Sequence, residues 1–316
     1  MPETDDRKTG IGGDDPPVPV QTEDSPLDLS VPDLKQTVRR TVQQVIEDRV
    51  TIVGAGMAFY WFLSVFPALL ALAGLSALVG AARGTASVVD RALARVMPGD
   101  AAAVLTGALG DASPGTEGAS VTAVAIGLAV ALWSASTGMV AMQMGLDIAY
   151  DVPRSRSFLR KRLYALALMA ATLVLGGIAT ALIVFGQPIG DWLWERFLFG
   201  GAVWHVARWV GAVVAVTVLF AFFYFLAPNR PSPRWQWVSP GGVLGTLVWL
   251  AASAGFSVYV RDFGSYAQTY GSLAGVIVLI LWLWLTALAV LLGGELNAEM
   301  ERQAAIREGR TTDPAA

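Results

Sequence analysis

An uncharged apolar segment near the C-terminus constrains this chain more than any other feature. It runs from Ser272 to Gly294 and reads SLAGVIVLILWLWLTALAVLLGG. An α-helix rises about 1.5 Å per residue, so the segment spans roughly 34 Å, slightly more than the hydrocarbon core of a bilayer at about 30 Å. In lipid, only helices and closed barrels satisfy their backbone hydrogen-bonding groups. The segment therefore predicts a membrane-spanning helix.

The composition extends this prediction to the whole chain and excludes several classes of site. Hydrophobic residues make up 54% of the chain and charged residues 15%, whereas soluble proteins contain about 25% charged residues. There is no cysteine and one histidine, His205, so we expect no disulfide, no transition-metal centre and no cofactor. The net charge of −3 gives no basic field for nucleic acid.

Catalytic motifs are missing as well. The sequence contains neither a phosphate-binding Gly-x4-Gly-Lys-[Ser/Thr] loop nor a Gly-x-Ser-x-Gly elbow. A single histidine leaves little room for a Ser-His-Asp site. We therefore expect a protein that is not an enzyme and that binds no metal.

The apolar pattern predicts an all-α, polytopic membrane helical bundle with six transmembrane helices. Residues 1–29 are rich in Asp, Pro, Gly and Thr and are expected to form a disordered acidic tail. A membrane domain covers residues 30–303, and a disordered C-terminal tail covers 304–316. The expected spans are about 51–79, 121–142, 163–185, 206–226, 238–260 and 272–294.

Amphipathic helices are expected beside these spans. In residues 30–49, apolar side chains recur at spacings of three and four, as at Leu34, Val38, Val42 and Ile46. This pattern is typical of an interfacial helix on the membrane surface, and equally of a helix packed on the bundle. Residues 80–120 predict short external helices that either cap the bundle or lie in the outer interface.

The basic residues indicate the orientation of the bundle. With six spans, one side holds 16 of the 22 Lys and Arg residues and the other side holds 6. The richer side contains both termini and the connections between spans 2 and 3 and between spans 4 and 5. The positive-inside rule then predicts that both termini are cytoplasmic.

A proline interrupts the first span. Pro67 removes one backbone hydrogen bond near the middle of the helix, and Ser64 lies one turn before it. Such a break is either a hinge that lines a cavity or a static kink, and the kink is the commoner case.

Small residues four positions apart predict close helix packing. The pairs are Gly241 with Gly245 and Gly271 with Gly275, and the consecutive Gly293 and Gly294 end the last span. Small side chains let helix backbones approach closely. We expect these residues to serve packing within the bundle.

Four polar residues near span ends are further candidates for lining a cavity. They are Asp147, Arg208, Glu295 and Asn297. Charges at interface depth commonly serve as anchors or salt-bridge partners. Glu295 is the strongest candidate, because it follows two glycines at a depth where a carboxylate needs a partner.

Two sequence segments carry a family resemblance. Residues 58–67, AFYWFLSVFP, resemble the first span of the YihY/BrkB family of bacterial inner-membrane proteins, and Tyr270-Gly-Ser with Gly293-Gly-Glu-Leu-Asn297 resembles its last span. The similarity covers residues 35–303. The resemblance implies six spans, cytoplasmic termini and a link to envelope integrity, and for some members the movement of lipid or lipopolysaccharide precursors. The family also carries an old ribonuclease label, which this sequence does not support, because it shows no clustered carboxylates of the kind that hold two metal ions for phosphodiester cleavage.

These observations favour a protein that translocates a lipid or another amphipathic envelope molecule. The alternative is a non-transporting scaffold for envelope machinery. The expected partners are membrane lipid and envelope proteins.

Overall fold

The protein is a bundle of helices, seen here in a computed structural model that describes residues 31–78, 129–153, 156–196, 200–230, 235–262 and 272–307. Within those ranges the chain contains no strand, which confirms the all-α membrane bundle. The helices are α1 (Val31–Glu47), α2 (Val50–Leu78), α6 (Thr137–Ala149), α7 (Phe158–Ala171), the π-helix η2 (Thr172–Gly176), α8 (Gly177–Arg196), α9 (Gly200–Leu226), α10 (Trp235–Asp262) and α12 (Ser272–Arg307).

Five helical segments in the described part are long and apolar enough to cross a membrane. They are α2, the continuous helix α7–η2–α8, α9, α10 and α12. The span expected at residues 121–142 is described only from residue 129 onward, where a helical stretch leads into α6. The count of six spans therefore stays a prediction. The short helices expected in residues 80–120 lie outside the described residues.

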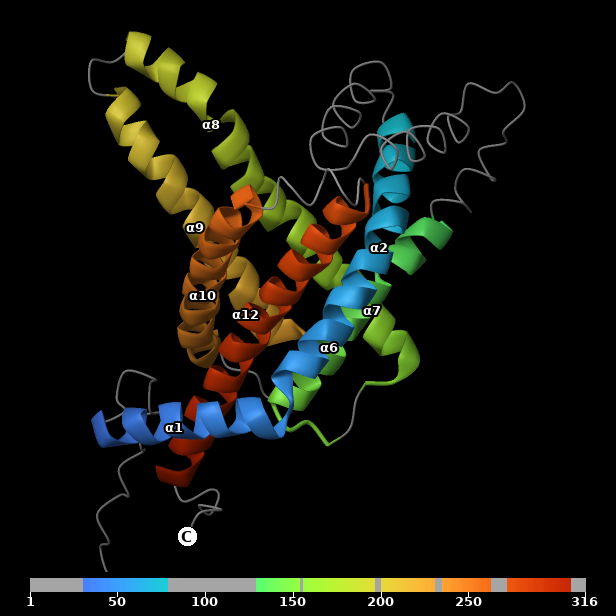
Figure 1. Cartoon of the computed structure of the whole chain (residues 1–316), viewed down its shortest axis with the longest axis vertical. Coiled ribbons are helices and arrows are strands. Elements are labelled where there is room, and N and C mark those ends of the chain that lie inside the picture. Colours follow the sequence, from blue (N-terminus) through green and yellow to red (C-terminus); the bar gives the residue numbers. More distant parts are fainter. Residues whose placement is uncertain are drawn as a thin grey trace, which may run out of the picture.

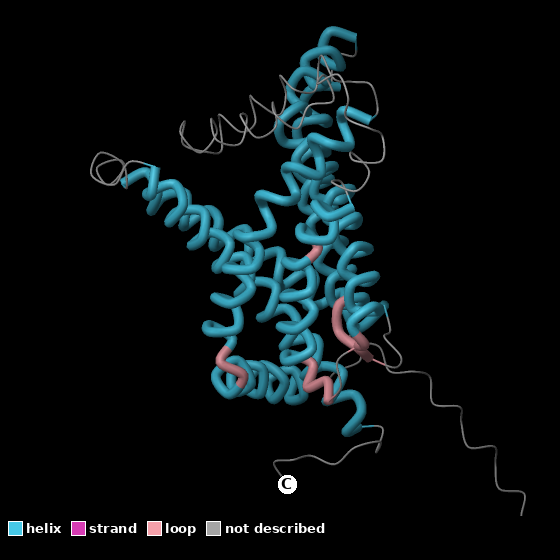
Figure 2. Tube along the Cα trace, turned by 90° about the vertical axis from the view of Figure 1, so that its right-hand side faces the viewer, coloured by secondary structure: helices cyan, strands magenta, loops and turns pink. Residues whose placement is uncertain are grey.

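Helix α12 organises the bundle. It contacts α1, α2, α6, α9 and α10, and it passes through the middle of the view in Figure 1. Helices α8 and α9 pair with each other and lean away from the other helices toward the upper left of that view. Figure 2 shows the bundle turned by 90° about the vertical, so the tip of the α8–α9 pair stands at the top of both views.

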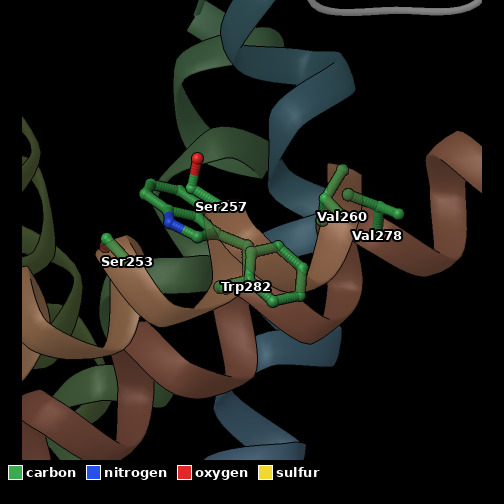
Figure 3. Close-up of a pocket in the computed structure, with 6 residues that line it drawn as sticks. Ser253, Ser257, Val260, Val278 and Trp282 are labelled. Carbon is green, nitrogen blue, oxygen red and sulfur yellow. The ribbon is translucent and has the colours of Figure 1, made fainter. Parts of the chain in front are cut away.

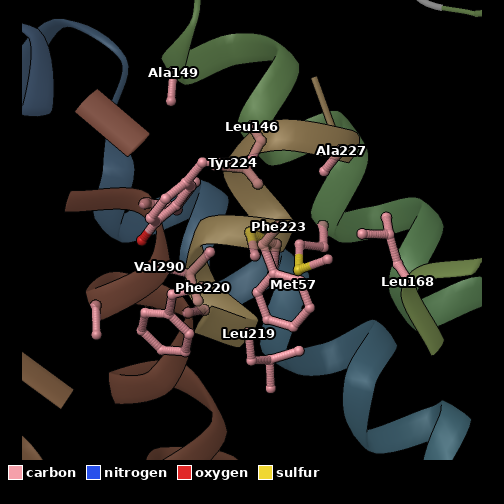
Figure 4. Packing of buried hydrophobic residues seen from close by; sticks show 14 of the residues in the cluster. Met57, Leu146, Ala149, Leu168, Leu219, Phe220, Phe223, Tyr224, Ala227 and Val290 are labelled. Carbon is pink, nitrogen blue, oxygen red and sulfur yellow. The ribbon is translucent and has the colours of Figure 1, made fainter. Parts of the chain in front are cut away.

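The main core lies where α2, α6, α9 and α12 meet. Met57, Met142, Leu146 and Val290 are at most 2% exposed, and Figure 4 shows buried side chains from several helices gathered around Met57 and Phe223. Many other apolar side chains point outward. A helix that is apolar on all sides needs an apolar environment on all sides, as a membrane provides.

Helix α1 crosses the bundle at the end where α12 finishes (Figure 1). It contacts α12, with Thr37 and Thr41 buried. Its apolar stripe, defined as Leu34, Val38, Val42 and Ile46, is between 48% and 71% exposed. Helix α1 therefore packs on the bundle through a polar face and leaves its apolar face uncovered, and its place at the membrane surface stays a prediction.

Candidate functional site at the α1 end of the bundle

Helices α10 and α12 cross at two glycines. A Cβ atom added to Gly293 would lie 2.6 Å from the carbonyl oxygen of Gly241, and one added to Gly241 would lie 2.2 Å from the carbonyl oxygen of Gly293. Such distances exclude any side chain larger than hydrogen. Gly294 similarly faces Leu146 of α6, whose Cδ2 atom would lie 2.8 Å from an added Cβ. The backbones of α10 and α12 are therefore in direct contact at Gly241 and Gly293.

A hydrogen bond next to a proline joins these two helices. Pro240 lies inside α10 near its start, where a proline disturbs the regular backbone ladder. The backbone N–H of Gly241 donates instead to Oδ1 of Asn297, at 2.7 Å. Asn297 is fully buried, so this bond fixes the position of α12 against the first turns of α10.

Tyr224 fills the space beside the glycines. Its side chain is fully buried, and its hydroxyl oxygen would lie 2.2 Å from a Cβ atom on Gly293 and 2.7 Å from one on Gly245. That hydroxyl has no hydrogen-bond partner in the described part of the protein. Tyr224 thus holds α9 against α10 and α12 through van der Waals contact with the glycines.

Carboxyl groups gather where the α1–α2 turn meets α12. Glu295 and Glu299 are 1% and 2% exposed, although both carry a charge in their ordinary ionised form. Arg302 forms ion pairs with Glu299, at 3.0 Å, and with Asp151. Asp48, in the turn between α1 and α2, interacts with the Glu295 side chain. This carboxyl cluster is defined as Asp48, Asp151, Glu295 and Glu299. Of the ion pairs among the described residues, those to its members come from Arg302.

A second polar group lies at the C-terminal end of α9. Asp147 accepts a hydrogen bond of 2.8 Å from the backbone N–H of Asn229. Arg156 donates to the carbonyl oxygens of Ala227, at 2.5 Å, and Pro228, at 2.8 Å. Carbonyl groups at a helix C-terminus lack partners in their own helix, so a cation there is favourable. Arg230 completes the group by pairing with Glu301 of α12.

The surroundings shift the pKa values of three groups outside the membrane spans. Burial, and then the nearby carboxylate of Asp151, raise the pKa of Asp48 above its ordinary value of 3.8. Burial also raises the pKa of Tyr150, against the effect of Arg230. Burial lowers the pKa of Arg156. The α1 end of the bundle therefore contains ionisable groups that are partly removed from water.

The structure brings three of the six candidate cavity residues to this end: Asp147, Glu295 and Asn297. The other three lie elsewhere. Ser64 is buried on α2 and donates to the carbonyl oxygen of Tyr60, at 2.8 Å, while the half-buried Pro67 lies within α2.

Arg208 is the sixth candidate, and it lies on α9 between the α8–α9 connection and the core. It is 6% exposed and lies 3.0 Å from Nδ1 of His205. Of the glycines expected to pack closely, Gly271 lies outside the described residues, and Gly275 is half-buried near the start of α12.

A groove opens between α10 and α12 at membrane depth. It has a volume of about 430 Å³ and is lined by Ser253, Phe256, Ser257 and Val260 from α10 and by Val278 and Trp282 from α12. Figure 3 shows the Trp282 ring lying between the two helices, with Ser257 beside it. The lining is mainly apolar, with two hydroxyl groups.

Sequence reasoning missed several residues of these sites. Asp48, Asp151, Arg156 and Arg230 lie in turns or loops, where no periodic pattern marks a buried role. The spacing of Ser253 and Ser257 on α10 places both on one helix face, and this was the available signal for the groove. Among the described residues, no group of three or more His, Cys, Asp or Glu side chains has a geometry suited to a metal ion.

Comparison with known proteins finds relatives, two of which, among the following three, are named as membrane proteins. A putative ribonuclease-like protein, YfkH, of Bacillus subtilis (strain 168) is 38% identical over 184 residues, which cover 57% of this chain and 66% of the relative. A UPF0761 membrane protein of Tolumonas auensis is 32% identical over 141 residues, 44% of each chain. A UPF0761 membrane protein of Laribacter hongkongensis is 29% identical over 177 residues, 56% of this chain and 40% of the relative.

The chain thus spans between 40% and 66% of the length of these three relatives. No solved structure is significantly similar to it. The family model described as virulence factor BrkB matches residues 41–316, which include every described helix beyond the first turns of α1. With five apolar helices of membrane-spanning length in its described part, the chain belongs to the virulence factor BrkB family of membrane proteins.

Proposed function

We propose that this protein acts in envelope integrity by translocating a lipid or another amphipathic envelope molecule across the bacterial inner membrane. The observation that carries the proposal is the groove between α10 and α12. It lies on two membrane-spanning helices and is lined by Phe256, Val260, Val278 and Trp282, with the hydroxyl of Ser257 exposed at its side. An apolar groove with a few polar groups fits a molecule that has an acyl chain and a polar head.

The proposal assigns no catalytic step to the protein. The ribonuclease-like name of the relative from Bacillus subtilis belongs to that protein. Phosphodiester cleavage by a metal-dependent route uses clustered ligands for one or two metal ions. The carboxyl cluster at the α1 end is instead engaged with Arg302 and with its own members.

Transport can be tested by reconstituting the full chain into liposomes that contain fluorescent phosphatidylethanolamine or phosphatidylglycerol. A membrane-impermeant reductant added outside then measures how fast labelled lipid reaches the outer leaflet. The assay is run with and without an imposed proton gradient. We expect faster movement than in protein-free vesicles. If neither labelled lipid moves faster than in protein-free vesicles, transport of these lipids is rejected.

A variant in the groove gives a sharper test. Ser257→Phe places an aromatic ring in the groove, whereas Leu247→Phe adds a ring on an exposed part of the same helix. We expect several-fold slower lipid movement for Ser257→Phe and an unchanged rate for Leu247→Phe. Equal rates for the two variants would show that lipid does not pass along this groove.

A scaffold role is favoured by a different feature, the exposed apolar stripe of α1. A contiguous apolar face of this kind marks a site for a membrane surface or a protein partner. A scaffold should co-purify with an envelope protein after mild cross-linking. Cells that carry only the Pro67→Ala or Glu295→Gln variant should then keep normal envelope integrity.

The proposed orientation places both termini in the cytoplasm. It is supported by contacts among the segments that carry most of the basic residues: Arg40 bonds to Gln303, and Arg302 and Arg230 join two loops to α12. The chain has no cysteine, so single cysteines report topology cleanly. In intact cells, a membrane-impermeant maleimide should label Ser113→Cys and not Glu47→Cys, and the reverse result would invert the orientation.

A further inference from the structure

Glu295 is a buried acidic residue whose carboxyl group lacks a compensating cation. Its side chain is 1% exposed, and its Oε1 atom has no hydrogen-bond partner among the residues that the structure describes. Removing an ionised carboxylate from water is costly unless a cation or several hydrogen-bond donors replace the water. In the described part of the protein, no basic side chain forms an ion pair with Glu295.

The side chain that faces Glu295 is another acid. Asp48, in the turn between α1 and α2, lies within hydrogen-bonding range of the Glu295 carboxyl group. The Oδ2 atom of Asp48 is also buried, and no group with a hydrogen to donate bonds to it within the described ranges. Two ionised carboxylates have no hydrogen to share, so a hydrogen bond between them requires a proton on one of the two.

The surrounding charges make a second negative charge still less favourable. The other groups near the pair are Glu47, Asp151, Glu299, Arg302, Arg40 and Tyr150. Arg302 is bonded to Glu299 and Asp151, and Arg40 donates to Gln303. Both arginines are therefore already bonded to groups other than Asp48 and Glu295.

We propose that Asp48 and Glu295 form a proton-binding site that holds one proton between their two carboxyl groups at neutral pH. The pair then carries a single negative charge, and a carboxylic acid on one residue donates to the carboxylate of the other. A pair of carboxyl groups that shares one proton is a known solution to this electrostatic problem. The site joins the α1–α2 turn to α12, so release of the proton places two like charges across that contact.

The absence of a metal-binding geometry supports a proton as the ligand. No set of three or more acidic or histidine side chains in the described ranges is arranged to hold a metal ion. A proton needs only two oxygen atoms that face each other. The half-exposed Asp151 side chain gives this region access to water at the α1 end.

Infrared spectroscopy of the full chain in detergent tests the site directly, because a protonated carboxyl group has its own C=O stretching band. We expect a carboxylic acid band at neutral pH that disappears on strong alkalinisation. Glu295→Gln should remove this band, since the Gln amide can donate to the Asp48 carboxylate in place of the acid. Asp48→Asn should leave Glu295 able to ionise, so the band should disappear at a lower pH than in the wild type.

Glu301→Gln is the matched control, because Glu301 lies on the same helix and pairs with Arg230. This variant should keep the band. The proposal is overturned if the wild type shows no carboxylic acid band at neutral pH, or if the band persists in folded Glu295→Gln protein. A band that appears only after dialysis against a chelator would also overturn it, because a cation would then occupy the site. Thermal unfolding confirms that each variant is folded before its spectrum is interpreted.

Discussion

The backbone N–H of Gly241 donates a hydrogen bond to the side chain of Asn297, 56 positions later in the chain, and so connects α10 to α12. The acceptor oxygen is 2.7 Å away, and both residues are buried. The bond stands next to the glycine contact at Gly293. The donor is on α10 and the acceptor is on α12, so replacing Asn297 measures what this bond contributes to the stability of the fold.

Asn297→Ala should destabilise the protein. The variant leaves the N–H of Gly241 buried without an acceptor, which costs about 1–3 kcal/mol. The matched control is Thr246→Ala on α10, whose hydroxyl donates only to Gly242 of its own helix, at 2.8 Å. Thermal unfolding in detergent should show a clearly lower Tm for Asn297→Ala than for Thr246→Ala. Similar Tm values would mean that the interhelical bond adds little.

Gly293→Ala should separate α10 from α12. The added methyl group would lie 2.2 Å from the hydroxyl oxygen of Tyr224 and 2.6 Å from a backbone carbonyl oxygen, so the helices must move. Overpacking of this kind costs about 1–3 kcal/mol. Gly255→Ala is the control on an open surface of α10, with no atom within 4 Å of the added methyl group. That substitution should raise stability by about 0.5–1 kcal/mol. A Gly293→Ala variant with the wild-type Tm would show that the contact is looser than these distances indicate.

Lower pH should stabilise the joint between α1 and α2 through Asp48. Burial and Asp151 raise the pKa of Asp48 above 3.8 in the folded protein. A carboxyl group with a raised folded pKa contributes stability that is full below its unfolded pKa and is lost as the pH rises through the folded pKa.

Asp48→Asn should therefore have a higher Tm than the wild type at neutral pH, and the difference should shrink toward about pH 4. Thermal unfolding over this range measures both effects. A variant that is less stable than the wild type at neutral pH would show that the Asp48 charge is favourable in the fold.

Arg49→Gly should also stabilise the α1–α2 joint. Arg49 has φ of 51°, a left-handed conformation that favours glycine. Relief of this conformation is worth about 1 kcal/mol. Asp151 has a similar φ of 50° but pairs with Arg302, so Asp151→Gly loses an ion pair as it relieves the backbone. The Tm should rise for Arg49→Gly and should rise less, or fall, for Asp151→Gly. A lower Tm for Arg49→Gly would indicate that its side chain is needed at this joint.

The sequence predicts the helices of this protein well and their contacts poorly. Long apolar runs predict helices by length alone. Helices α2 and α10 begin and end within a few residues of the expected limits, whereas α9 starts earlier, at Gly200, and the helix expected at 163–185 runs from Phe158 to Arg196. Helix α12 continues to Arg307, beyond the predicted span end at Gly294, because a helix that leaves the membrane becomes polar without breaking.

Contacts are harder to predict because these helices are apolar on nearly every side. Periodicity then does not identify which face packs, and Tyr224 gives no sign in the sequence that it lies between Gly245 and Gly293. Glu295 could be selected as unusual from its depth alone. Its acidic neighbour Asp48 could not, because the two are brought together only by the position of α1 across the bundle.

The crossing at Gly241 and Gly293 restricts how α10 and α12 can move. Sliding α12 by one helical turn would bring Ala289 or Asn297 opposite Gly241, where the present backbone contact leaves no room for a side chain. Tilting about the same point needs no such change. The two glycines therefore act as a pivot, and any rearrangement that widens the groove at Ser257 and Trp282 is expected to rotate the far halves of the two helices while this end stays in register.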